Sequence, residues 1–299
     1  MQSLFDSHNT KTLEDKAILL IQCEDQKGIL AKVCHFLAHH NANIVSLQEY
    51  ADVKTNQFYC RVEWEMNGFS LSSVAEFNQS FHEEVGSNFS MDFRIYFTSQ
   101  RPRVCVFVSK YSHCLEDLLY RHASGELAVD IPLIISNHKA LAPIAKLRNI
   151  PFHYFKMNNS NKQSIEKEQR KLIEETDCDV VVLARYMQIL SAEFVQAYKN
   201  RIINIHHSFL PAFTGAKPYH AAHKRGVKVI GATAHFVTEQ LDEGPIICQD
   251  VTKITHKDSV QDMVIKGRDT EKQMLSKAVK LFCAHKVITG VDQRTIVFD

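Results

Sequence analysis

The feature that most constrains the fold is a regular alternation of short apolar runs with amphipathic segments in the middle of the chain. Apolar runs of strand length occur at residues 103–108, 128–136, 152–155 and 180–184. Segments with apolar residues at helical spacing lie between them, at residues 114–121, 141–147 and 163–175. Strands that alternate with helices of this size predict a doubly wound, mostly parallel α/β sheet.

A different order precedes this alternation. Strand-like runs occur at residues 17–23, 43–48, 57–64 and 91–97, with helical patterns at 29–37 and 71–84. The resulting order βαββαβ predicts a ferredoxin-like domain. The polar segment 98–102 ends in Pro102 and is the expected linker. The expected organisation is therefore a first domain at 1–97, a linker at 98–102 and a second domain at 103–299.

Composition excludes several classes of protein. The chain has 35 basic and 34 acidic residues among 299, which gives no general field for nucleic acid or for a membrane surface. Its purely apolar runs are far too short to span a bilayer, and its N-terminus lacks the apolar segment of a signal peptide. Its eight cysteines are scattered and form no Cys-x-x-Cys pair. We expect a cytoplasmic protein with neither nucleic acid nor membrane as a partner.

Residues 201–250 concentrate polar side chains at the ends of expected strands. Asn204 and His206 share one face at the end of a strand at 202–206, and His235 lies near the end of a strand at 229–236. Asp242 follows in a loop bounded by glycine and proline. An amide that stabilises an oxyanion, an imidazole that moves a proton and a carboxylate that orients the imidazole or activates water could meet here. Taken singly, each of these residues would more often be structural.

The combination resembles a known family. Asn204-Ile205-His206 before a Ser-Phe-Leu-Pro loop, with Leu-Asp242-x-Gly-Pro downstream, is similar to the catalytic domain of the folate-dependent formyltransferases and formyl hydrolases, which use 10-formyltetrahydrofolate. The resemblance implies that Asn204, His206 and Asp242 are catalytic. It also implies a folate-binding segment formed by Tyr186, Met187, Gln188, Ile189 and Leu190. His235 is expected to bind the substrate as well. Without the resemblance, this segment would more often be a helix start with core residues.

The turn after the first strand of the second domain bears on the acceptor of the formyl group. The family member that formylates glycinamide ribonucleotide has a glycine-rich phosphate loop there, whereas residues 109–114 here contain no glycine. Neither a dinucleotide site nor a P-loop is supported elsewhere. The expected reaction is hydrolysis of 10-formyltetrahydrofolate to formate and tetrahydrofolate, which would supply formate for purine biosynthesis and balance one-carbon folate pools. The alternatives are a formyltransferase to an amine acceptor and a non-catalytic protein that binds an amino acid or folate.

No cofactor beyond the folate substrate is expected, and no catalytic metal. His220 and His223 have a helical ligand spacing. They lack the Glu of the zinc-protease motif and an evident third ligand.

The first domain carries a resemblance of its own. Asp25-x-x-Gly28-Ile29-Leu30, followed by Asn41-x-Asn43-Ile44, is similar to an ACT domain, a module that often binds an amino acid between paired copies. The resemblance implies a homo-oligomer and an effector such as methionine or glycine near Asp25, Gly28, Ile29, Asn41 and Asn43. The alternative is a dimerisation module with an empty groove.

Overall fold

The computed structural model describes residues 15–158, 160–212 and 218–299. These residues form two compact units, of which the first consists of residues 15–100, 285–292 and 296–299. The second unit consists of the described residues of 101–284 together with 293–295. Residues 1–14, which the sequence assigns to the first domain, lie outside the described residues.

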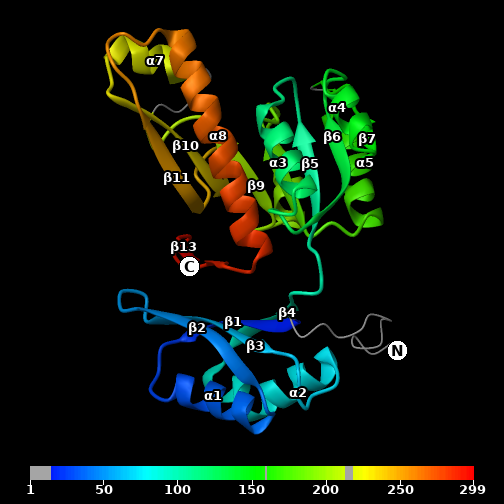
Figure 1. Ribbon diagram of the computed structural model, residues 1–299, viewed down its shortest axis with the longest axis vertical. Helices are drawn as coiled ribbons and strands as arrows, with labels where there is room; N and C mark the ends of the chain where they lie inside the picture. The colour runs from blue at the N-terminus through cyan, green and yellow to red at the C-terminus, as the bar shows by residue number, and fades with distance from the viewer. Residues whose placement is uncertain (1–14, 159, 213–217) are drawn as a thin grey trace. The chain divides into compact units, whose positions relative to one another are not determined.

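The first unit is a four-stranded antiparallel sheet with two helices on one face (Figure 1). Its elements in chain order are β1 (Lys16–Glu24), α1 (Ile29–His39), β2 (Asn43–Asp52), β3 (Gln57–Glu65), α2 (Val74–Glu84), the 3-10 helix η1 (Gly86–Phe89) and β4 (Asp92–Phe97). The strands are ordered β2-β3-β1-β4, and every pair is antiparallel. This topology confirms the ferredoxin-like fold expected from the sequence.

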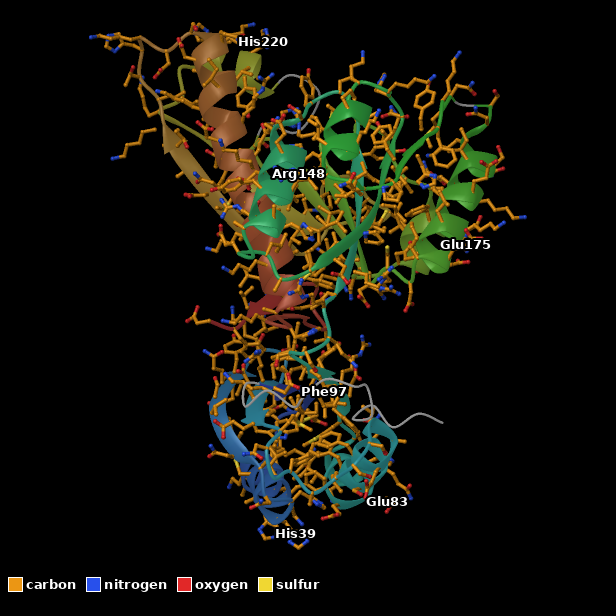
Figure 2. The ribbon with its side chains drawn as sticks, turned by 45° about the vertical axis from the view of Figure 1, so that its right-hand side comes forward. His39, Glu83, Phe97, Arg148, Glu175 and His220 are labelled. Carbon is orange, nitrogen blue, oxygen red and sulfur yellow. The ribbon has the colours of Figure 1, made fainter. Side chains whose placement is uncertain are left out.

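The core of this unit lies between the sheet and its two helices. Because side chains alternate along a strand, Phe58, Cys60, Val62 and Trp64 of β3 all face the helices, and Trp64 is fully buried. Polar residues such as His39 and Glu83 lie on the outer faces of α1 and α2 (Figure 2). The helices form here because each has one apolar stripe to bury against the sheet.

The segment that follows the last long helix packs with the first unit. Nε of Arg61 donates to the carbonyl oxygen of His285 at 3.0 Å, and the His285 ring stacks on Tyr96 with ring centroids 3.7 Å apart. The backbone N–H of Val291 donates to the hydroxyl of Tyr59. The sequence places residues 285–299 in the second domain. The structure differs because the partners of this segment lie in strands far earlier in the chain, where no local pattern specifies the pairing.

The second unit is built on a seven-stranded sheet ordered β11-β10-β9-β8-β5-β6-β7 (Figure 1). Its elements are β5 (Arg103–Val108), α3 (His113–Ala123), β6 (Asp130–Ser136), α4 (Ala142–Leu147), β7 (Phe152–Tyr154), α5 (Lys162–Glu175), β8 (Val180–Ala184), α6 (Ala192–Ala197), β9 (Ile202–His206), α7 (Pro218–Arg225), β10 (Val229–Phe236), β11 (Ile246–Lys253) and α8 (Val260–Cys283). Strands β5 to β9 pair in parallel, and β10 and β11 are antiparallel. The mostly parallel α/β sheet expected from the sequence is confirmed. Two short strands, β12 (Val287–Thr289) and β13 (Thr295–Val297), form a separate pair whose residues, except Thr295, belong to the first unit.

Helices cover both faces of this sheet. Helices α5 and α6 pack on one face, in a core that includes Phe107, Leu183 and Phe194. Helix α8 packs on β9, β10 and β11 from the other face, where Phe282 meets Phe236 edge to face. Because β8 pairs in parallel with both β5 and β9, the carboxyl ends of these strands meet at one edge of the sheet, the usual place for a ligand site in such folds.

Some local features differ from the expectation. Strand β11 and helix α6 were not anticipated, since β11 is half exposed and mixes polar with apolar residues, and α6 is a short helix of six residues. Helix α8 is continuous through Gly267. A Cβ at Gly267 would lie 2.0 Å from the hydroxyl of Tyr219, so the glycine admits a neighbouring side chain. Among the described helices, none combines the length and the apolar composition needed to cross a bilayer.

Candidate active site

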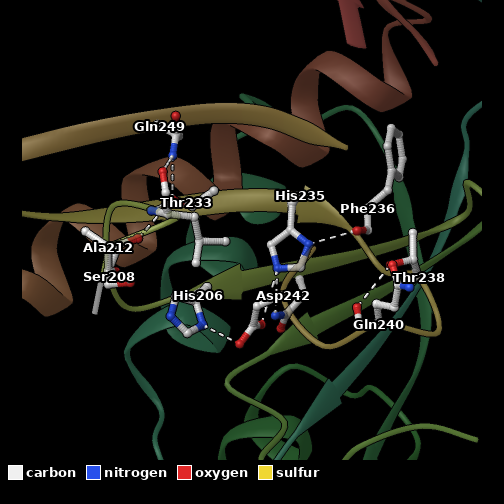
Figure 3. Close-up of polar contacts among 12 residues, drawn as sticks. His206, Ser208, Ala212, Thr233, His235, Phe236, Thr238, Gln240, Asp242 and Gln249 are labelled. Carbon is white, nitrogen blue, oxygen red and sulfur yellow. Dashed lines mark hydrogen bonds and ion pairs between the residues drawn. The ribbon is translucent and has the colours of Figure 1, made fainter. Parts of the chain in front are cut away.

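The structure brings the three expected catalytic residues together at this edge of the large sheet. Asn204 and His206 lie in β9, and Asp242 lies in the loop between β10 and β11. Nδ1 of His206 is 3.1 Å from Oδ2 of Asp242, and the side chains are 6% and 12% exposed. Figure 3 shows Asp242 between the rings of His206 and His235.

The contact with Asp242 fixes the tautomer of His206. A carboxylate oxygen can only accept a hydrogen bond, so Nδ1 of His206 carries the shared proton. Nε2 of the same ring is buried and has no hydrogen-bond partner among the described residues. A neutral His206 therefore presents a lone pair on Nε2 to whatever molecule enters the site. A general base needs this arrangement.

Asp242 is ionised at neutral pH. Burial opposes its ionisation, but the hydrogen bond and the charge of His206 outweigh burial and hold the pKa of Asp242 well below its usual range. The residue has a left-handed backbone, with φ at 58°, which Asp tolerates better than most residues. Two residues later, a Cβ at Gly244 would lie 1.7 Å from the carbonyl oxygen of Phe236. Only glycine lets the loop approach β10 closely enough to place the carboxylate.

His235 links Asn204 to Asp242. It pairs with Asn204 across β9 and β10, so the two side chains lie on the same face of the sheet. Nδ1 of His235 donates to the carbonyl oxygen of Phe236 at 2.8 Å, which leaves Nε2 of the neutral ring as an acceptor. Nδ2 of Asn204 lies 3.2 Å from this Nε2, and Oδ1 of Asp242 lies 3.6 Å from it. One N–H of Asn204 is thereby held in place, and its second N–H can serve a ligand.

The loop after His206 is anchored on β10 by Thr233. The Thr233 hydroxyl donates to the carbonyl oxygen of Ser208 at 2.9 Å and accepts from the backbone N–H of Leu210 at 3.0 Å (Figure 3). Nε2 of Gln249 also donates to this hydroxyl, at 2.9 Å. Thr233 is fully buried. Its bonds hold the chain that leaves His206 and so limit the positions that the imidazole can take.

The expected folate-binding segment forms the loop between β8 and α6. Tyr186 and Leu190 turn into the core beside α5 and α6, whereas Met187 and Ile189 are 53% and 64% exposed and Gln188 is partly exposed. The backbone N–H of Met187 donates to Oγ of Ser109, and Ser109 donates to Oδ1 of Asn137. At the far end, the backbone N–H of Ser191 donates to the buried carboxylate of Glu166. The loop is thus held at both ends with two apolar side chains open to a ligand.

Comparison with known proteins decides the family. A family model described as formyl transferase matches residues 102–279, and an ACT domain model matches residues 17–62. A formyltetrahydrofolate deformylase of Synechocystis sp. is 46% identical over 282 residues, which are 94% of this chain and 98% of that protein. The chain belongs to the formyltetrahydrofolate deformylase family. A crystal structure of a formyltetrahydrofolate deformylase from Pseudomonas syringae pv. tomato has a TM-score of 0.92 at 43% identity, with 95% of each chain covered.

A transferase shares part of the deformylase architecture. The crystal structure of glycinamide ribonucleotide transformylase 1 from Symbiobacterium toebii has a TM-score of 0.63 at 28% identity. It covers 68% of this chain and 97% of its own chain. The fold of the second unit is therefore common to deformylases and at least one amine formyltransferase, and the fold alone does not choose between water and an amine as the acceptor.

Sequence reasoning missed a second polar cluster in the deformylase chain, formed by His113, Arg185, Tyr219 and Glu271. The signal for it was a charged residue, Glu271, within the apolar stripe of α8, four residues after Gly267. Ligand atoms of His113, Cys114 and Glu271 lie within 4.8 Å of one another and could in principle hold a metal ion. However, Nε of Arg185 lies 3.4 Å from Oε2 of Glu271, and its positive charge opposes a cation there. His220 and His223, on α7, are both exposed.

The residues expected to bind an effector are spread over the ACT unit. Gly28 precedes α1 with φ at 92°, a conformation that glycine adopts without strain. Asp25 is exposed beside this turn, and Ile29 is buried in the core. The side-chain amides of Asn41 and Asn43 donate to the carbonyl oxygen of Gly68 and to the carboxylate of Glu65. The two asparagines thus already have partners within the unit.

Proposed function

We propose that this chain hydrolyses 10-formyltetrahydrofolate to formate and tetrahydrofolate, using Asn204, His206 and Asp242. The observation that carries the proposal is the buried and unpartnered Nε2 of His206, in a ring whose other nitrogen is held by Asp242. Membership of the deformylase family supports the same reaction. Released formate would enter purine biosynthesis, and the reaction would balance the one-carbon folate pools.

We assign a separate task to each of the three residues. Nε2 of His206 takes a proton from water as the water oxygen attacks the formyl carbon. The ionised Asp242 stabilises the resulting imidazolium. The imidazolium and the free N–H of Asn204 together stabilise the negative oxygen of the tetrahedral intermediate. The proton on Nε2 then passes to the leaving nitrogen of the folate as the C–N bond breaks. His235 acts through Asn204 by holding its side-chain amide in position.

The folate itself would lie on the loop from Tyr186 to Leu190. We assign ring contacts to the exposed side chains of Met187 and Ile189, and polar contacts to Gln188 and to backbone groups of the loop. Tyr186 and Leu190 would support the loop from the core. We propose no cofactor beyond the folate substrate.

Formate release from the purified protein, with 10-formyltetrahydrofolate and no amine present, tests the hydrolase. We expect turnover that His206→Ala abolishes. A formyltransferase would release little formate until an amine is added, and a binding protein would bind the folate without turnover. Either result would replace the proposal by the corresponding alternative.

The ACT unit is proposed as a regulatory and oligomerisation module, with residues 98–102 as the linker to the catalytic part. The left-handed Gly28 and the exposed Asp25 beside it support a ligand site at the start of α1. An amino acid such as methionine or glycine would bind there, between two copies of the chain. Calorimetry with each amino acid, together with light scattering for the oligomer, tests this. The absence of heat at millimolar concentrations would leave the unit as a dimerisation module in a cytoplasmic enzyme.

A further inference from the structure

A buried carboxylate that the proposed mechanism does not use lies beside the catalytic histidine. Glu271 projects from α8 and is 1% exposed. It meets residues at the start of α3, directly after β8 and in α7. His207, next in sequence to His206, connects this cluster to the catalytic site, since its ring centroid lies 5.1 Å from that of His206 and 6.0 Å from that of Tyr219.

Two hydrogen-bond donors and the guanidinium of Arg185, which forms an ion pair without a hydrogen bond from Nε, surround the carboxylate. Nε2 of His113 lies 2.8 Å from Oε2 of Glu271, and the hydroxyl of Tyr219 donates to Oε1 at 2.7 Å. Nε of Arg185 lies 3.4 Å from Oε2. Guanidinium, imidazole and phenol groups are the side chains that proteins use to bind carboxylate and phosphate. The surroundings of Glu271 are therefore those of an anion-binding site.

The charge state agrees with this description. Burial opposes ionisation of Glu271, but the hydrogen bond from His113, the charge of Arg185 and the hydrogen bond from Tyr219 lower its pKa. Arg268 adds positive charge nearby, since its guanidinium and that of Arg185 both lie 5.5 Å from the ring centroid of Tyr111. Without Glu271, Arg185 would be a nearly buried cation with no anion in contact.

The backbone is adapted to hold the cluster. Arg185 follows β8 with a left-handed backbone, φ at 62°, which is uncommon for such a residue. Gly267 lies one helical turn before Glu271, and a Cβ there would lie 2.0 Å from the hydroxyl of Tyr219. Both features place donors against the carboxylate, so the site is built around it.

We propose that His113, Arg185 and Tyr219 form an anion-binding site that the chain fills with its own carboxylate, Glu271. The inference rests on the proposed hydrolysis. The filled site lies beside the catalytic His206 and leaves no room there for the phosphate of an amine acceptor. An example of such an acceptor is the glycinamide ribonucleotide for which the Symbiobacterium toebii transformylase is named. Water then remains as the acceptor of the formyl group. Glu271 is in this sense a specificity-determining residue.

Inorganic phosphate serves as the probe of this site. The melting temperature of the full-length protein is measured against phosphate concentration at constant ionic strength, for the wild type, Glu271→Ala and the double variant Arg185→Met/Glu271→Ala. We expect Glu271→Ala to gain a saturable rise in melting temperature of several degrees, or to fold only when phosphate is present. The wild type and the double variant should not respond, because one keeps its internal anion and the other has lost the arginine. The double variant should also fold, since removal of both partners leaves no unpaired buried charge.

Formate release by Glu271→Ala, measured over the same phosphate series, tests the location. Phosphate should inhibit the variant and leave wild-type turnover unchanged. The proposal is overturned if Glu271→Ala folds and ignores phosphate, if it fails to fold at every phosphate concentration, or if it binds phosphate without inhibition. A wild type that releases no formate would instead count against the proposed hydrolysis, whatever the phosphate response of the variants.

Discussion

Nδ1 of His206 lies 3.1 Å from Oδ2 of Asp242, and no described group of the protein bonds to Nε2 of the same ring. The carboxylate therefore both selects the tautomer and supplies the negative charge that a transient imidazolium needs. A substitution of His206 or Asp242 should therefore affect proton transfer, measured as kcat, much more than the binding of folate, measured as a dissociation constant.

Asp242→Asn should keep the shape of the site and remove its charge. We expect kcat for formate release to fall by on the order of a hundredfold or more, since the protonated His206 loses its counter-ion. The dissociation constant for the folate should change little, which a fluorescence titration with tetrahydrofolate checks. A variant that keeps turnover within a few-fold of the wild type would show that Asp242 is not needed for the proton transfer.

Asn204→Ala should remove one donor from the developing oxyanion. Such a loss typically lowers kcat by about 10²–10³-fold. His235→Gln is the matched comparison, because His235 contacts Asn204 and acts only through it. Its loss of kcat should be smaller, with KM near the wild-type value. Equal losses in the two variants would mean that Asn204 holds His235 and not the oxyanion.

Much of this site could be predicted from the sequence because strand periodicity places Asn204 and His206 on one face and the loop motif adds Asp242. His235 was expected to bind substrate, and the structure shows it bonded to Asn204, 3.6 Å from Oδ1 of Asp242 and 2% exposed. Strand pairing of β9 with β10 decides this contact, and the register of two strands separated by a long loop is not a local property of the sequence.

The fold followed from the sequence to the extent that local patterns control it. Alternating apolar runs specified β5 to β8 with small errors at their ends. Strand β11 was not predicted because its half-exposed pattern resembles that of a loop. The contacts of residues 285–292 were not predicted because their partners, Arg61 and Tyr96, lie far away in the chain. Glu271 was missed for the same reason, since nothing near it in sequence shows the donors that surround it.

The free energy of unfolding should depend on His207 in mildly acidic solution. Burial, followed by the charge of Arg185, lowers the pKa of His207 to about 4. In the unfolded chain the pKa of His207 is about 6.5. Between pH 6.5 and 4 the unfolded state therefore binds a proton on His207 that the folded state does not bind. Above pH 6.5 His207 is neutral in both states and adds no pH dependence; as the pH falls toward 4, it lowers the free energy of unfolding by about 3 kcal/mol.

His207→Gln should therefore flatten the loss of stability between pH 6.5 and 4.5, measured by urea unfolding followed by circular dichroism. His285, whose pKa burial also lowers to about 4, is the control in the other unit. Trp64, the single tryptophan, is buried in the first unit, so its fluorescence should report His285→Gln and not His207→Gln. A pH profile that is identical in the wild type and in His207→Gln would contradict the assignment.

Thr233→Val should lower kcat although Thr233 is not one of the proposed catalytic residues. The change keeps the volume of the side chain and deletes the hydroxyl that joins Ser208, Leu210 and Gln249. Buried partners then lose a hydrogen bond each, which typically costs about 1–3 kcal/mol of stability per unsatisfied group. The loop after His206 loses its anchor on β10, so kcat should fall while the folate still binds. Thr233→Ser, which restores the hydroxyl, should recover most of both losses, as kinetics and urea unfolding of the two variants would show. If Thr233→Ser were as impaired as Thr233→Val, the methyl group and not the hydroxyl would hold the loop, and the position of His206 would depend on packing.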